Sequence, residues 1–174
     1  MTLRLAASHD IPALRRLMDR AISGLMNDVL TPEQVQASFD IMGMDTQLIA
    51  DETYFVVELE GQIAGCGGWS RRATLFGGDQ TDGRNAALLD PAKDAARVRA
   101  MYTDPDFVRR GVGRMILDHC EIAARAEGFS RAEMAATMAG EPLYRACGYE
   151  VIEPFDGVSK AGVRVPLLRM GKAI

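Results

Sequence analysis

The strongest constraint in the sequence is residues 107–117, FVRRGVGRMIL, where two arginines precede Gly-Val-Gly and apolar residues then follow at helical spacing. Glycine weakens a helix by up to about 1 kcal/mol relative to alanine, so Gly111 and Gly113 suggest that bare backbone is needed there. Just before them, residues 97–103 alternate like a strand, and Pro105 ends that pattern because proline cannot donate a sheet hydrogen bond. A strand, a turn and a glycine-rich helix start are therefore predicted in succession.

The rest of the chain alternates between strand-like and helix-like segments. Strands are predicted at 2–6, 53–59, 63–70 and 131–137 and in two segments, YEVIE and VRVPLLRM, near the end of the chain. Helices are predicted at about 11–25, after the capping box that Thr31 forms with Gln34, at about 111–126 and across 139–149. Residues 71–96 are the least regular stretch, and a loop of that length is usually functional or mobile.

Turns rather than helices join the central strands, so much of the sheet is expected to be antiparallel. We predict a mixed α/β (α+β) fold with helices flanking a largely antiparallel central sheet. The chain has 174 residues, 48% of them hydrophobic, which suits one compact domain over residues 1–174.

Composition excludes several classes of function. The net charge is −4 and the pI about 5.2, which gives no support for nucleic-acid binding. No apolar run approaches the roughly 20 residues of a membrane span, and the first residues lack the apolar core of a signal peptide. Cys66, Cys120 and Cys147 are too scattered for a zinc site and are expected to be reduced core thiols. We therefore expect a soluble cytoplasmic protein that holds no metal.

The glycine-rich turn is a candidate anion site. A helix start exposes unpaired N–H donors and the positive end of the helix dipole, and arginines at 109, 110 and 114 add charge. No Lys-Ser or Lys-Thr follows the glycines, as a Walker A loop requires, and Ile116 stands where a dinucleotide fingerprint has its third glycine. From spacing alone, a phosphate site and a plain arginine-decorated helix start are about equally supported.

Two segments carry a family resemblance. MYTDPDFVRRGVGRMIL resembles the acetyl-coenzyme-A motif of the GNAT (GCN5-related) N-acetyltransferase family, a strand and turn followed by Gln/Arg-x-x-Gly-x-Gly/Ala at a helix start. Val108 stands at the Gln/Arg position of that motif, and two arginines follow it. EPLYRACGY (141–149) resembles the late family helix that carries a tyrosine, and the predicted order of elements also agrees over nearly the whole chain.

This resemblance implies an acetyl-CoA-dependent N-acetyltransferase with a GNAT-like acyl-CoA N-acyltransferase fold. Met101, Tyr102 and Thr103 would pair through their backbone with the pantetheine arm, as an added strand does. Tyr144 would donate a proton to the departing thiolate of coenzyme A. The residues expected to wrap the pyrophosphate, mostly through backbone amides, are Arg109, Arg110, Gly111, Val112, Gly113 and Arg114.

The acceptor is expected to be a primary amine of a small molecule or a protein, and a homodimer is left open. The general base is not evident from the sequence. Glu133 precedes the Tyr144 helix, although an exposed strand glutamate is the commoner explanation; Glu58, Asp79 and Asp82 are further candidates. Two other functions stay open: a non-catalytic acyl-CoA sensor on the same fold, or an acyltransferase for a longer acyl chain. Tyr144 favours catalysis, because sensing needs no proton donor.

The acceptor pocket of such enzymes is usually built by the first two helices and the loop at 71–96. Basic side chains of that loop would suit an anionic acceptor, and its acidic side chains would suit a cationic one. The sequence therefore does not indicate the charge of the acceptor. The side chains concerned are Arg71, Arg72 and Arg84, and Asp79, Asp82 and Asp90. Trp69, at the end of the strand before the loop, is more simply explained as a core residue.

Overall fold

The computed structural model describes residues 1–174, and its seven strands form one sheet in the order β1-β2-β3-β4-β5-β7-β6. The strands are β1 (Thr2–Leu5), β2 (Tyr54–Leu59), β3 (Gln62–Ser70), β4 (Ala96–Thr103), β5 (Arg131–Thr137), β6 (Glu150–Val158) and β7 (Arg164–Ala173). Every neighbouring pair is antiparallel except β4 and β5, which are parallel. The predicted mixed, largely antiparallel sheet is confirmed.

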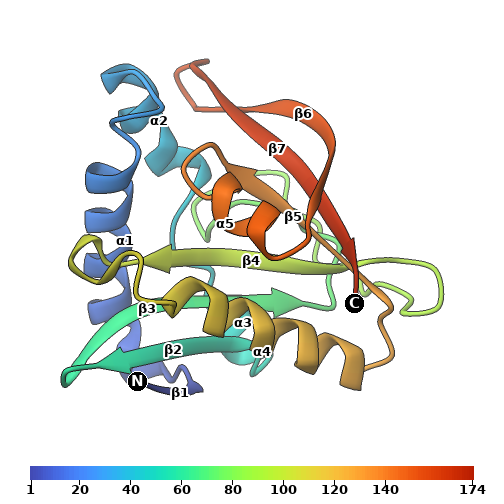
Figure 1. Cartoon of the computed structure of the whole chain (residues 1–174). Helices are drawn as coiled ribbons and strands as arrows, with labels where there is room; N and C mark the ends of the chain where they lie inside the picture. The colour runs from blue at the N-terminus through green and yellow to red at the C-terminus, as the bar shows by residue number, and fades with distance from the viewer.

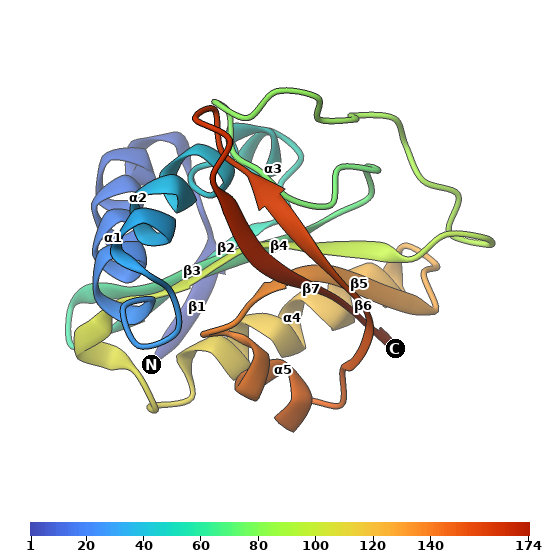
Figure 2. The same cartoon turned by 90° about the horizontal axis from the view of Figure 1, so that it is seen from above.

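Helices cover both faces of this sheet (Figures 1 and 2). They are α1 (Ile11–Leu25), α2 (Pro32–Ile41), α3 (Thr46–Ala50), α4 (Val112–Ala126) and α5 (Glu141–Ala146), with 3-10 turns at Ser8–Asp10 and Pro105–Phe107. Figure 2 shows α1 and α2 on one face and α4 and α5 on the other. Strand alternation divides the core between them, since Val56 packs in the cluster under α1 and its neighbour Val57 packs in the cluster under α4.

Local sequence explains where most helices begin. The hydroxyl of Thr31 accepts a hydrogen bond from the Gln34 amide at 3.2 Å, and the Gln34 side chain accepts one from the Thr31 amide at 3.0 Å. This is the predicted capping box, and it opens α2. Helix α3 was not predicted, because its five residues are too few to show helical periodicity. Its start is fixed by Asp45, whose carboxylate accepts from the Gln47 amide at 3.1 Å.

Glycines in β3 bring α4 close to the sheet. A Cβ atom added at Gly65 would overlap Val112, and one added at Gly67 would overlap Met101 and Ile116. The first turns of α4 therefore lie directly against β3 and β4, which places the Gly-Val-Gly start of the helix beside the end of β4.

Strands β4 and β5 separate soon after they begin. They pair only through Ala96 with Ala132 and Arg97 with Glu133, and in Figure 1 they diverge beyond that point. Ala100 lies within β4 at a φ of 50°, and the register between β3 and β4 shifts at the same place. Residues 98–103 of β4 therefore have no strand partner on the β5 side.

Candidate active site

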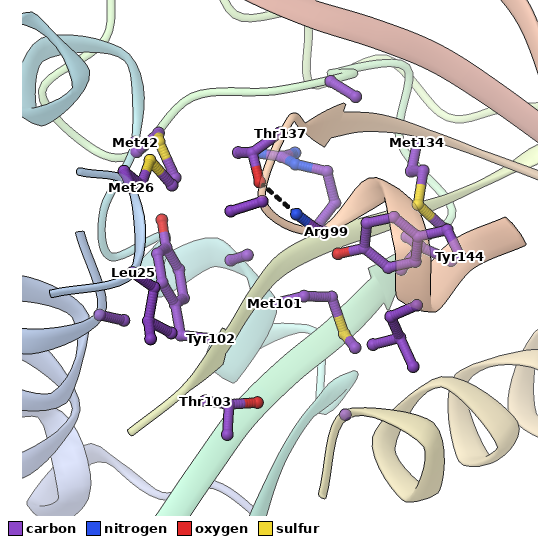
Figure 3. Close-up of a pocket in the computed structure, with 18 of the residues that line it drawn as sticks. Leu25, Met26, Met42, Arg99, Met101, Tyr102, Thr103, Met134, Thr137 and Tyr144 are labelled. Atoms are coloured by element: carbon purple, nitrogen blue, oxygen red, sulfur yellow. Dashed lines mark hydrogen bonds between the residues drawn. The ribbon is translucent and has the colours of Figure 1, made fainter. Parts of the chain in front are cut away.

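The separation of β4 and β5 opens one large cavity of about 740 Å³, within the usual size of a ligand site. Its walls come from α1, the end of α2, the loop after β3, the open edges of β4 and β5, the start of α4, α5 and β7. Figure 3 shows the side chains of Met101, Met134 and Tyr144 on one side of it and those of Leu25, Met26 and Met42 on the other. The two segments that carry the family resemblance, the start of α4 and the helix α5, therefore both line this cavity.

The start of α4 presents unpaired backbone donors to this cavity. Gly111 is the N-cap of the helix, with a φ of 83° that favours glycine, and no side chain caps the helix. The first hydrogen bond of the helix runs from the Met115 amide to the Gly111 carbonyl at 3.0 Å, and the amides of Val112, Gly113 and Arg114 have no partner. A Cβ atom added at Gly111 would meet no atom within 4 Å, so this backbone faces open space. Such a helix start can hold an anion.

The three arginines predicted around this turn have different environments. Arg109 and Arg114 line the cavity, and Arg109 adopts a φ of 63°. Arg110 does not line the cavity: its guanidinium pairs with Glu60 and lies 5.4 Å from the centre of the Phe107 ring. The positive charge available to an anion at this turn therefore comes from Arg109 and Arg114.

Tyr144 lies on α5 with its hydroxyl turned into the cavity beside β4 (Figure 3). The side chain is buried, packs edge-to-face on Tyr149 with ring centres 6.3 Å apart, and makes no hydrogen bond through its hydroxyl. Burial raises the pKa of the Tyr144 phenol above its ordinary value. The group is therefore a protonated donor at neutral pH, with its hydrogen free for a ligand.

The predicted strand residues Met101, Tyr102 and Thr103 all line the cavity, on the part of β4 that has no β5 partner. The Tyr102 hydroxyl accepts a hydrogen bond from the Gly43 amide at 2.8 Å, which ties β4 to the segment after α2. The Tyr54 hydroxyl donates to the Ala100 carbonyl at 2.8 Å and so holds the irregular point of the strand. The open edge of β4 is thus fixed before any ligand arrives.

None of the carboxylates considered as a base lines the cavity, and the expectation that one of them serves there is not supported by their positions. Glu133 is held between Arg97 at 2.8 Å and Arg169 at 2.6 Å. Glu58 pairs with Arg4, and Asp79 accepts hydrogen bonds from Thr46. Glu133 lies opposite Arg97 in the short stretch where β4 and β5 still pair, before the cavity opens between the two strands.

The charged residues of the loop after β3 also lie outside this cavity. Arg71 pairs with Glu127, Arg72 with Asp51 and Arg84 with Asp45, so these arginines are engaged within the protein. Asp82 and Asp90 do not line the cavity either. Trp69 is buried and packs on Phe129 with ring centres 6.0 Å apart, in agreement with a core role.

Sequence reasoning missed the residues that form the far side of the cavity. Leu25 and Met26 end α1, Met42 follows α2, and Phe76 comes from the loop after β3. Their spacing marks them only as members of an apolar face, so no local signal distinguishes them from core residues. Arg99 was missed as well: it is buried, lines the cavity, and bonds to Asp45 at 2.9 Å and to the Gly77 carbonyl at 2.6 Å.

Two further properties concern the whole chain. No group of three or more His, Cys, Asp or Glu side chains is arranged to hold a metal ion. None of the helices combines the length and the apolar character that a membrane crossing would need.

Comparison with known proteins identifies the family. Residues 50–151 match the family model described as an acetyltransferase (GNAT) domain, and the chain therefore belongs to the GNAT acetyltransferase family. The match covers β2 to the start of β6 and includes the separated strands, the start of α4 and Tyr144. No curated protein matches the sequence significantly.

Solved structures of the same fold extend over nearly the whole chain. A GCN5-related N-acetyltransferase from Rhodopseudomonas palustris has a TM-score of 0.73 and 19% identity, over 99% of this chain and 95% of that one. A ribosomal-protein-alanine N-acetyltransferase from Brucella melitensis has a TM-score of 0.66 and 19% identity, over all of both chains. The yncA protein from Salmonella typhimurium, determined with its cofactor acetyl-CoA, has a TM-score of 0.63 and 20% identity, over 99% and 93% of the chains. At these identities the likeness concerns the fold.

Proposed function

We propose that residues 1–174 form a single acetyl-CoA-dependent N-acetyltransferase domain that acetylates a primary amine of a small molecule or a protein. The observation that carries this proposal is the meeting of three features in one cavity. These are the unpaired edge of β4, the uncapped start of α4 and the free hydroxyl of Tyr144. Each of these features matches one part of acetyl-CoA: the pantetheine arm, the diphosphate and the sulfur.

The residues present fit acetyl-CoA from its diphosphate to its sulfur. The amides of Val112, Gly113 and Arg114 would bind the diphosphate, with Arg109 and the Arg114 side chain as counter-charges. Residues 101–103 of β4 would hold the pantetheine arm through main-chain hydrogen bonds, as a sheet edge holds an added strand. The bound thioester supplies an activated acetyl group.

Tyr144 is assigned the role of general acid. In the transfer, the amine nitrogen forms a bond to the acetyl carbon and the carbon–sulfur bond breaks, leaving a thiolate. Tyr144 donates its hydroxyl hydrogen to that sulfur, and its raised pKa keeps the phenol protonated until the thiolate forms. The proton lost by the amine replaces the one given to sulfur, so that the products are an acetamide and free coenzyme A.

Thermal unfolding tests cofactor binding. A ligand that binds only the native state at 100 times its Kd stabilises a protein by about 2.7 kcal/mol. A domain of this size gains about 2–4 °C per kcal/mol, so the unfolding midpoint should rise by roughly 5–10 °C. An unchanged midpoint at saturating acetyl-CoA would refute the proposed function together with the sensor alternative.

Tyr144→Phe separates catalysis from binding. We expect kcat to fall by about 100-fold or more while the Kd for coenzyme A stays within twofold, because the lost hydroxyl has no partner within the protein. Tyr149→Phe is the matched control, since the Tyr149 hydroxyl is also buried without a partner but does not line the cavity. Equal turnover of the two variants would remove Tyr144 from the mechanism and favour a different proton donor.

A further inference from the structure

The far side of the cavity, opposite Tyr144, is an apolar chamber. We define it by Leu25, Met26, Met42, Phe76 and Leu167, contributed by α1, the end of α2, the loop after β3 and β7. Figure 3 shows the first three of these grouped near Tyr102, across the cavity from Tyr144. Two of these five residues are methionines, and their flexible thioether chains adapt to apolar groups of different shape.

The chamber contains no carboxylate that could pair with a cation. No aspartate, glutamate or histidine lines any part of the cavity. The charged lining residues are Arg99, Arg109 and Arg114, and the last two lie on either side of Gly111, the N-cap of α4. A positively charged acceptor would therefore meet no side chain of opposite charge there.

Arg99 does not turn the chamber into an anion site either. Its guanidinium bonds to Asp45 at 2.9 Å and to the carbonyls of Thr74 at 3.2 Å and Gly77 at 2.6 Å. Asp45 also pairs with Arg84 at 2.9 Å, and Arg84 lies 3.7 Å from Asp79. The positive charges of the two arginines are therefore matched by the negative charges of the two aspartates. The apolar chamber thus lies beside a charge cluster that is neutral as a whole.

These features bear on the charge of the acceptor nitrogen. An alkyl amine with a pKa near 10.4 is neutral in only about one molecule in 2,500 at pH 7. Entering the chamber would strip water from its ammonium with no carboxylate to replace that water. An amine whose conjugate acid has a pKa below 7 avoids this penalty, because it is already neutral in solution.

We propose that the acceptor is a weakly basic primary amine on an apolar body, of the arylamine type, which enters the apolar chamber in its neutral form. This inference rests on the proposed acetyltransferase function and narrows its substrate class. No protein base is then required. The nitrogen lone pair bonds to the acetyl carbon as the carbon–sulfur bond breaks, Tyr144 gives its proton to sulfur, and the resulting phenolate takes the proton released by nitrogen.

Aniline and cyclohexylamine test the idea, because both carry one amino group on a six-membered ring and differ chiefly in basicity. With aniline, kcat/KM should be flat between pH 6.5 and 9. With cyclohexylamine, kcat/KM should rise about tenfold per pH unit over the same range, as its neutral fraction does. A cyclohexylamine profile that levels off near pH 7 would reveal a base in the protein and overturn the proposal.

A diamine tests the chamber itself. We expect 1,6-diaminohexane, which keeps a second cation, to have a kcat/KM at least tenfold below that of cyclohexylamine at pH 8. Met42→Glu, which adds a carboxylate to the chamber, should reverse that order, whereas the neutral variant Met42→Gln should gain no preference for the diamine. Calorimetric titration of both amines into protein saturated with coenzyme A gives a second readout that does not depend on turnover. A diamine preferred by the unaltered protein would contradict the proposal.

The outcomes also separate this inference from the proposed function. Thiol release that is fastest with cationic amines would overturn the acceptor class and leave the acetyltransferase function in place. Binding of coenzyme A without thiol release for any of the three amines would count against both. Acetylation of aniline with a flat pH profile would support both.

Discussion

Gly111→Ala is the most direct test of the helix start as an anion site, and its effects can be worked out in advance. At a φ of 83° an alanine costs roughly 1–2 kcal/mol, because its Cβ crowds the following carbonyl. No atom lies within 4 Å of the added Cβ, so no further clash arises. The unfolding midpoint should therefore fall by only a few degrees, since about 1 kcal/mol corresponds to 2–4 °C in a domain of this size.

Binding should suffer more than stability. The new methyl group would enter the open space at Gly111, directly before the unpaired amides of Val112 and Gly113 in the chain, where we propose that the diphosphate binds. Losing one hydrogen bond to a charged group is worth about 1.5–3 kcal/mol, so the Kd for coenzyme A should rise by roughly 10- to 150-fold. Calorimetric titration with coenzyme A measures this change directly.

Gly162→Ala provides the matched control. Gly162 has a φ of 82° and no atom within 4 Å of an added Cβ, but it lies between β6 and β7 and does not line the cavity. Both variants should lose similar stability, and only Gly111→Ala should lose affinity. Equal Kd values for the two variants would show that the diphosphate does not bind at the start of α4, and the reasoning from Gly111 would be wrong.

Two further predictions concern stability. Asp45→Ala leaves the buried Arg99 without its carboxylate and should lower the free energy of unfolding by about 3–5 kcal/mol. Urea unfolding measures this loss, and Asp82→Ala, at an exposed position, is the control. A loss below about 1 kcal/mol would contradict the importance assigned to the Asp45–Arg99 pair. The hydrogen bond from Arg4 lowers the pKa of Asp10 from 3.8 to about 2, so this carboxylate contributes stability above about pH 4 that is lost as the pH falls through 2. Urea unfolding of Asp10→Asn should therefore show a smaller loss between pH 5 and pH 2.5 than the unaltered protein, and an equal loss would refute the assignment.

Elements with strong local signals were predictable from the sequence. The Thr31 capping box, the proline after β4 and the glycine N-cap of α4 each fix one boundary through chemistry within a few residues. The same holds for the positions of Tyr144 and Gly111, because their motifs sit on elements whose order the sequence already indicates. The family match then agrees with the resemblance that these motifs carry.

Features that depend on distant residues were not predictable. Arg110 pairs with Glu60, which is 50 residues away in the chain, so its sequence position beside the glycines did not place it in the cavity. Glu133 is held by arginines of two other strands. The apolar chamber is likewise assembled from four separate elements, and each of its residues looks locally like part of a core face.

The brief pairing of β4 with β5 has a consequence for the molecule as a whole. Two residue pairs join a four-stranded half, β1 to β4, to a three-stranded half, β5 to β6, within one sheet. A pantetheine arm seated along β4 would add main-chain bonds where the protein has none of its own. Bound acetyl-CoA would then hold the two halves of the sheet together. Backbone amide hydrogens far from the reacting sulfur would therefore exchange with solvent more slowly when acetyl-CoA is bound.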